Sequence, residues 1–113
     1  MDDINIFEQY FEADGTFNGV ERHGAKVMLI CSSQGGTVRY EAAVSFFPHR
    51  EADDFAVSYD AYFSKEIISL EGRRSKKREE SLMKPFKDLL GMICREQKAK
   101  IFWDRPLTQP RRA

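Results

Sequence analysis

The sequence predicts an α+β fold, an antiparallel β-meander of three to five strands with one long amphipathic helix packed on one face. Two observations predict it. Apolar and polar residues alternate with period two in runs between residues 38 and 64, after a compact apolar run at residues 27–31, and turn residues separate these runs. Between residues 82 and 93 the apolar residues recur every three or four positions, which is helical spacing. A helix with one apolar stripe needs a partner, so we expect it to cover one face of the sheet.

Length and composition indicate one domain. The chain has 113 residues, of which 42% are hydrophobic and 32% charged, enough to bury a single core. We assign residues 1–105 to this domain and residues 106–113 to a flexible tail. The acidic N-terminus is unlike a secretory signal, and the longest apolar run, Val27 to Cys31, is too short to cross a bilayer. We therefore expect a soluble, cytoplasmic protein without membrane contact, in which Cys31 and Cys94 are buried, reduced thiols.

Near the N-terminus, the spacing of Ile4, Phe7 and Phe11 predicts a short helix over residues 4–13. Acidic residues precede it, at the positive end of such a helix. A first strand is the alternative, because Ile, Phe and Tyr also favour strands. After it, Asn18-Gly19 and His23-Gly24 are turn signals, so residues 16–24 form either a tight hairpin or a loop.

The clearest strand pair is a hairpin of Val27–Cys31 and Val38–Phe46, joined at Gly35-Gly36. A third alternating run, Phe55–Ser64, follows a charged connection. Its phase breaks at Lys65, since continuing it would place this charge on the apolar face, and a bulge or bend is expected there. The opposite face of the sheet should present polar residues to solvent or a partner: Arg39, Glu41, Ser45, Ser58, Asp60 and Tyr62.

The helix should begin near Glu80-Ser81 or bend at Pro85, because proline lacks the amide that a helix interior needs. Basic side chains at a helix start oppose its dipole, so we expect residues 73–78 mostly to precede the helix. Residues 100–103 predict a last strand. The stripe that faces the sheet comprises Leu82, Phe86, Leu89, Leu90 and Ile93.

Charge is unevenly distributed although the formal net charge is zero. Residues 1–60 contain 11 acidic and 4 basic side chains, and residues 61–113 contain 7 acidic and 14 basic ones. The run of five cations in residues 73–78 is typical of a segment that contacts phosphates. We therefore expect a small nucleic-acid-binding module that uses Arg73, Arg74, Lys76, Lys77, Arg78, Lys84 and Lys87, with Tyr62 and Trp103 stacking on unpaired bases.

Motifs for catalysis are absent from the sequence. His23 and His49 have no partner at metal-ligand spacing, and Ser32 and Ser33 lie outside any nucleophile motif. No glycine-rich phosphate loop is present. We expect no enzyme activity, no metal and no cofactor. The alternative to nucleic-acid binding is a protein-interaction or regulatory module, in which a charge-complementary partner binds, the acidic first half resembles a polyanion, or the chain forms a homodimer.

Overall fold

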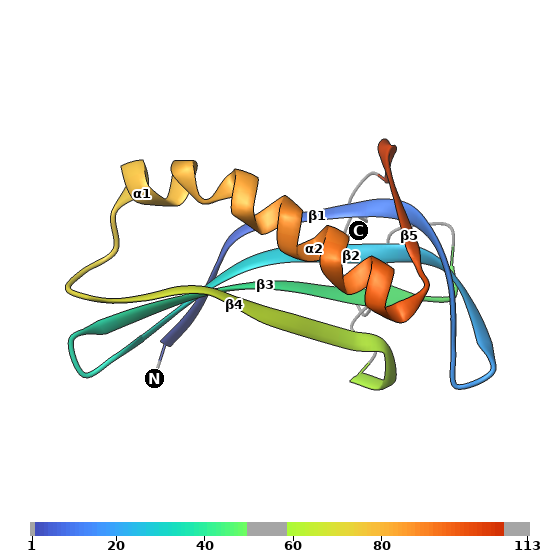
Figure 1. The fold of residues 1–113 in the computed structure, drawn as a ribbon, viewed down its shortest axis with the longest axis horizontal. Coiled ribbons are helices and arrows are strands. Elements are labelled where there is room, and N and C mark those ends of the chain that lie inside the picture. Colours follow the sequence, from blue (N-terminus) through green and yellow to red (C-terminus); the bar gives the residue numbers. More distant parts are fainter. Residues whose placement is uncertain (1, 50–58, 108–113) are drawn as a thin grey trace, which may run out of the picture.

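The fold is a five-stranded antiparallel sheet with two helices on one face (Figure 1). The computed structural model describes residues 2–49 and 59–107. The sheet has the order β4-β3-β2-β1-β5, so a meander from β1 to β4 is extended by β5 beside β1. The α+β prediction is confirmed at this level. The elements are β1 (Asp2–Phe17), β2 (Val20–Gln34), β3 (Thr37–Phe47), the short 3₁₀ helix η1 (Tyr59–Ala61), β4 (Tyr62–Glu71), α1 (Lys76–Ser81), α2 (Met83–Gln97) and β5 (Lys100–Leu107).

Two tight turns connect the first three strands. Asn18 and Gly19 have φ values of 52° and 75°, and Gly35 and Gly36 have φ values of 58° and 80°. Positive φ at both central residues is the mark of the type I′ turn, whose twist matches that of paired strands. Both hairpins therefore lie where the Asn-Gly and Gly-Gly pairs predicted them.

The predicted N-terminal helix over residues 4–13 is wrong, because this segment belongs to strand β1. The ladder between β1 and β2 shifts register between Asn5 and Phe7. One extra residue in a strand reverses the alternation beyond it. Apolar residues that share a face are therefore three positions apart across this bulge, which imitates helical spacing. The alternative of a first strand was the correct one.

His23-Gly24 also differs from its prediction, because it lies inside β2 and forms no turn. Gly24 faces Phe47 on β3. A Cβ atom at Gly24 would overlap the Phe47 ring and would lie 2.7 Å from the carbonyl oxygen of His49. Glycine is therefore required here by close packing.

We expect Gly24→Ala to destabilise the fold by about 1–3 kcal/mol, because the surrounding strands must move to admit the methyl group. Gly91→Ala is the matched control. It lies in α2, where the nearest atom to an added Cβ is Arg95 Nη1 at 3.6 Å, so the higher helix propensity of alanine should stabilise the fold by about 0.5–1 kcal/mol. Urea unfolding of both variants tests the pair, and equal effects would contradict the packing seen at Gly24.

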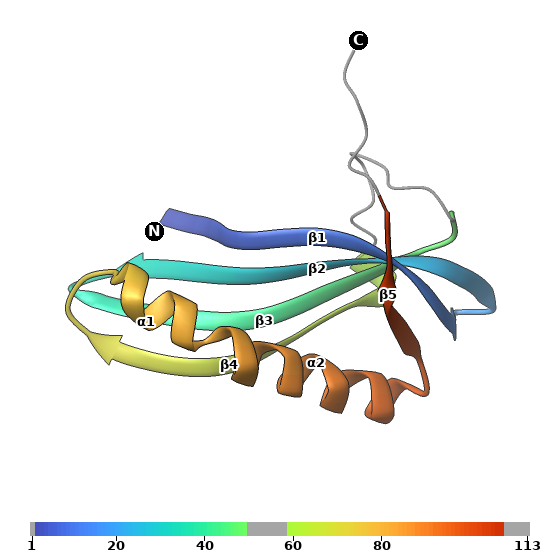
Figure 2. The same ribbon diagram turned by 90° about the horizontal axis from the view of Figure 1, so that it is seen from above.

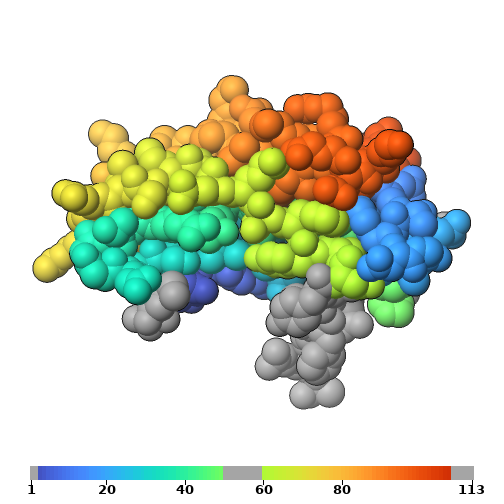
Figure 3. Space-filling model, turned by 60° about the horizontal axis from the view of Figure 1, so that its bottom comes forward, coloured from blue at the N-terminus to red at the C-terminus, as the bar shows by residue number. Residues whose placement is uncertain are grey.

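Strand β4 accommodates the break in alternation predicted at Lys65 in two ways, by a bulge and by an ion pair. Its ladder with β3 shifts register opposite Tyr40 and Glu41, which leaves Ile67 as the extra residue. Lys65 does lie on the helix-covered face, and its ammonium pairs with Glu96 of α2 at 2.9 Å. In Figure 3 β4 (yellow-green) and α2 (orange) lie side by side. Of the predicted third strand Phe55–Ser64, residues 55–58 lie outside the described residues, residues 59–61 form η1 instead of strand, and residues 62–64 begin β4.

The sequence predicted a single long helix, but the structure has two helices, α1 and α2, joined at Leu82. Pro85 explains the interruption, because it has no amide to donate to the carbonyl of residue 81, one turn earlier. It lies in the first turn of α2, where a missing donor costs little. Regular helix resumes as the Phe86 amide donates to the Leu82 carbonyl at 2.9 Å. Among the described residues, no helix is long and apolar enough to cross a membrane.

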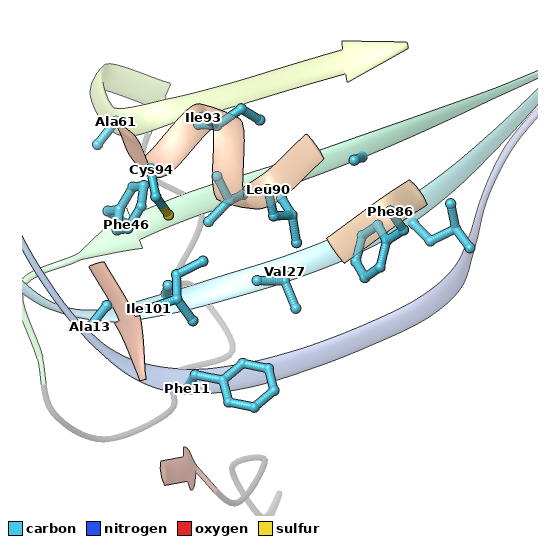
Figure 4. Close-up of a cluster of buried hydrophobic side chains, with 14 of the residues drawn as sticks. Phe11, Ala13, Val27, Phe46, Ala61, Phe86, Leu90, Ile93, Cys94 and Ile101 are labelled. Carbon is cyan, nitrogen blue, oxygen red and sulfur yellow. The ribbon is translucent and has the colours of Figure 1, made fainter. Parts of the chain in front are cut away.

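The main core lies between α2 and the sheet (Figure 4). Phe86 and Leu90 are fully buried, and the Phe86 ring lies edge-on to Phe7 with centroids 5.7 Å apart. Of the predicted stripe, Leu89 is only partly buried. Cys94 is a buried free thiol of the same core, and burial raises its pKa. Cys31, the other cysteine, is also free and buried, in an adjoining cluster.

The opposite face of the sheet is less polar than predicted. Tyr10 and Phe47 are buried and pack edge to face, with ring centroids 6.2 Å apart. Ser45, which was expected to face solvent, is fully buried beside them. Asp60 pairs with the buried Arg22 at 2.8 Å. This face therefore has a packed centre. The predicted exposure holds for Arg39 and Asp60, whereas Glu41 and Tyr62 are partly buried and Ser58 lies outside the described residues.

Candidate nucleic-acid interface

The basic run straddles the start of α1. Ser75 is the N-cap, since its Oγ accepts a hydrogen bond from the Arg78 amide at 3.3 Å. Arg73 and Arg74 precede this cap, whereas Lys76, Lys77 and Arg78 form the first turn of the helix. The expectation that the run mostly precedes the helix is therefore wrong for these three. A serine cap satisfies an amide at the helix start, and this allows the helix to begin within a cationic segment.

Arg74 has a structural partner within the fold. Its guanidinium donates two hydrogen bonds of 3.0 Å to the two carboxylate oxygens of Glu79. The Tyr40 hydroxyl donates to the same carboxylate at 2.7 Å. Only 5% of the Glu79 surface is exposed. Because a buried carboxylate needs such partners, these contacts fix α1 to the sheet.

The ionisation of this group follows from its contacts. Hydrogen bonds from Arg74, and secondly from Tyr40, hold the pKa of Glu79 below its ordinary value despite burial. Burial first, and then the bond to Glu79, raise the pKa of the Tyr40 phenol. Glu79 is therefore a carboxylate and Tyr40 a neutral donor at neutral pH. A phosphate would have to compete with Glu79 for Arg74.

Lys84 and Lys87 project from α2, one turn apart, and differ in their neighbours. The Lys84 ammonium pairs with Asp88 at 3.2 Å. Lys87 is exposed, and its ammonium lies 5.8 Å from the centroid of the Trp103 ring. Trp103 is 38% exposed and packs edge-on against Phe11 at 4.9 Å. The structure thus brings Lys87 and Trp103 together.

Tyr62 and the basic run lie apart from that pair. Tyr62 begins β4, which is one edge of the sheet, whereas Trp103 belongs to β5 at the other edge. The run begins α1, which lies at the opposite end of the helical pair from β5 (Figure 1). Seen from above, α2 spans the distance between them (Figure 2). The predicted residues therefore do not form one compact site.

Sequence reasoning missed a second aromatic group with cations, around Phe102. The Lys100 ammonium and the Arg105 guanidinium lie 5.1 Å and 4.8 Å from the centroid of its ring. These distances are within the range of cation–π contacts. The interleaving of cations and aromatics over residues 98–105 is visible in the sequence and was the signal that would have found this group.

Ion pairing divides the described residues into two classes. Every basic side chain of β1–β4 pairs with a carboxylate: Arg22 with Asp60, Lys26 with Glu8, Arg39 with Glu41 and Glu66, and Lys65 with Glu96. Residues 72–107, which we call the helix layer, contain eleven basic and five acidic residues. Within the described residues only two of these cations, Arg74 and Lys84, form an ion pair. The other nine are Arg73, Lys76, Lys77, Arg78, Lys87, Arg95, Lys98, Lys100 and Arg105.

Metal ligands do not gather in the described part of the chain. No group of three His, Cys, Asp or Glu side chains there is placed to hold an ion. The expected absence of a metal and of catalysis stays a prediction. No known family model, curated protein or solved structure matches this chain.

Proposed function

We propose that this chain is a small non-catalytic binding domain whose helix layer binds nucleic acid through phosphate contacts. What supports the proposal is the nine cations of the helix layer that lack an ion pair among the described residues, while every described cation of β1–β4 has one. Cations without an internal ion pair can each neutralise a phosphate and release its counterion. Phosphate binding would account for nine cations that form no ion pair among the described residues of the helix layer.

Stability does not explain the position of the basic run. Lys76, Lys77 and Arg78 occupy the first turn of α1, where the helix dipole disfavours positive charge. A sequence that served only the helix would place acidic residues there. Arg74 is the one member of the run whose pairing with Glu79 accounts for it. The remaining cations of the run form no ion pair among the described residues, which leaves them able to contact a polyanion.

We expect affinity for short DNA or RNA to fall steeply with salt, and Lys76→Ala/Lys77→Ala to reduce that dependence. The log–log slope should be about −0.7 per neutralised phosphate for single strands and about −0.9 for duplex DNA. Loss of two contacts should therefore flatten the slope by about 1.4 to 1.8 units. Fluorescence anisotropy of a labelled oligonucleotide at several salt concentrations measures this slope.

The matched control is Arg39→Ala/Lys65→Ala. It removes the same amount of charge, but from two cations of the sheet that already pair with carboxylates. Its slope should stay near that of the wild type. An equal effect of both double variants would mean that net charge alone governs binding. No salt-dependent binding to any polymer at low ionic strength would refute the proposal.

A protein partner is the second candidate. The described residues of β1–β4 and their connections, 2–49 and 59–71, contain ten acidic and four basic side chains. Such a surface favours a basic protein through charge complementarity. If nucleic acid fails to bind, capture of a basic protein by the wild type, reversed by salt, would support this candidate.

A further inference from the structure

The C-terminal strand carries an aromatic feature at the edge of the sheet. The ladder between β1 and β5 pairs Glu12 with Phe102 and then Phe11 with Pro106. Residues 103–105 lie between these two positions and have no partner on β1. No described strand covers the outer side of β5. We call residues 102–105 the edge bulge.

The edge bulge holds its aromatic side chains in defined positions. Trp103 is 38% exposed, yet its ring packs on the ring of the buried Phe11, with the two centroids 4.9 Å apart. A contact of this kind limits the motion of the indole without covering all of its surface. On the neighbouring residue, the Phe102 ring has both Lys100 and Arg105 within cation–π distance. The bulge therefore combines a supported aromatic surface with cations.

Lys87 adds a cation from the adjacent helix. Its ammonium is 5.8 Å from the Trp103 centroid, close to the outer limit of about 6 Å for a cation–π contact. An exposed lysine at this distance is weakly held, and its long side chain can move to a phosphate. A flat ligand could then take its place against the indole.

We propose that the edge bulge is a stacking site for an unpaired base, with Trp103 as the platform and Lys87, Lys100 and Arg105 as contacts to the flanking phosphates. The inference rests on the proposed function and assigns single-stranded nucleic acid as the ligand of this site. Aromatic side chains bind single strands because every base has a face to stack. Bases within a duplex are already stacked on one another, so they cannot use Trp103.

Trp103 is the only tryptophan of the chain, so tryptophan fluorescence, excited where tyrosine does not absorb, reports on this site alone. The probes are a single-stranded oligothymidine, a duplex of the same length, and heparin, a polyanion without bases. We expect oligothymidine to quench the emission with the same midpoint as its binding curve. Duplex and heparin should bind through the helix layer and leave the emission nearly unchanged.

Trp103→Leu should weaken binding of oligothymidine about five- to 150-fold, the range for loss of one stacked base, and leave heparin binding unchanged. Leucine keeps an apolar contact with Phe11, and a thermal melt verifies the fold. Lys87→Ala should weaken oligothymidine binding more than Lys84→Ala, because Lys84 already pairs with Asp88.

Three outcomes decide the question. Quenching that only oligothymidine produces supports the stacking site, even if the Trp103 variant fails to fold. Binding of all three probes with unchanged emission overturns the stacking site and leaves the proposed function standing. Absence of binding by every probe overturns both.

Discussion

Phe86→Ala is expected to destabilise the fold by about 3–5 kcal/mol, the cost of removing a fully buried aromatic ring and leaving a cavity. Phe86 is 0% exposed and contacts Phe7 on β1. It therefore joins α2 to β1, at the opposite end of the meander from β4. Urea unfolding monitored by circular dichroism measures the change.

Leu89→Ala is the control for that prediction. Leu89 belongs to the same apolar stripe in the sequence, but it is only partly buried. Its truncation should lower the free energy of unfolding by about 1–2 kcal/mol, because Leu89→Ala removes less buried apolar surface than Phe86→Ala does. If the two variants were equally destabilised, α2 would be rotated about its axis relative to the orientation described above.

Arg74→Ala should destabilise the fold by about 2–3 kcal/mol. The substitution leaves the buried Glu79 carboxylate with Tyr40 as its remaining hydrogen-bond donor. Breaking a fully buried ion pair costs about 3–5 kcal/mol, and we expect less because the Arg74 side chain is 39% exposed. Lys76→Ala, two residues further on, removes an exposed cation and should change stability by less than about 0.5 kcal/mol.

The two variants should rank in the opposite order by their effect on nucleic-acid binding. Lys76→Ala should weaken binding to DNA or RNA, whereas folded Arg74→Ala protein should bind nearly as well as the wild type. A variant of Arg74 that keeps its stability but loses binding would show that this guanidinium contacts phosphate instead of Glu79.

Acid provides an independent readout of the same ion pair. Because the pKa of Glu79 is lower in the folded state, its contribution is complete above the ordinary carboxyl pKa and is lost as pH falls through the lower folded value. The stability difference between wild type and Arg74→Ala should therefore shrink between pH 7 and about pH 3. A difference that grows toward low pH would contradict the described contacts.

The sequence predicted well those features that depend on neighbouring residues. Asn18-Gly19 and Gly35-Gly36 specify their own turns through positive φ. The alternation from Val38 to Phe46 predicts strand β3, which follows Gly35-Gly36. Pro85 predicted an interruption of the helix, although its position at Leu82 also depends on the Ser75 cap, which starts α1 earlier than expected.

Long-range contacts explain what was missed. Tyr40 and Glu79 are 39 positions apart, and nothing near Arg74 in the sequence marks it as different from Lys76. The bulge near Asn5 gives strand β1 an apolar spacing typical of a helix, because one inserted residue changes the spacing of the side chains that share a face. The sequence wrongly predicts a turn at Gly24, because the Phe47 ring that excludes a side chain there lies on another strand.

The candidate site was predicted as a set of residues but not as an arrangement. The sequence singled out Lys87 and Trp103, which the fold places together. It could not reveal that Tyr62 lies at the other edge of the sheet, because strand order depends on the whole meander. The distinction between the paired cations of β1–β4 and the nine cations of the helix layer that form no ion pair likewise depends on contacts between distant parts of the chain.

Amide chemical-shift mapping with a single-stranded oligonucleotide at low salt tests the central claim most directly. If the helix layer binds nucleic acid, the shifts should concentrate in residues 73–105, at the start of α1, on the exposed side of α2 and along β5. The strands β2, β3 and β4 should show little change. Shifts centred on those three strands, or no shifts at saturating oligonucleotide, would contradict the account.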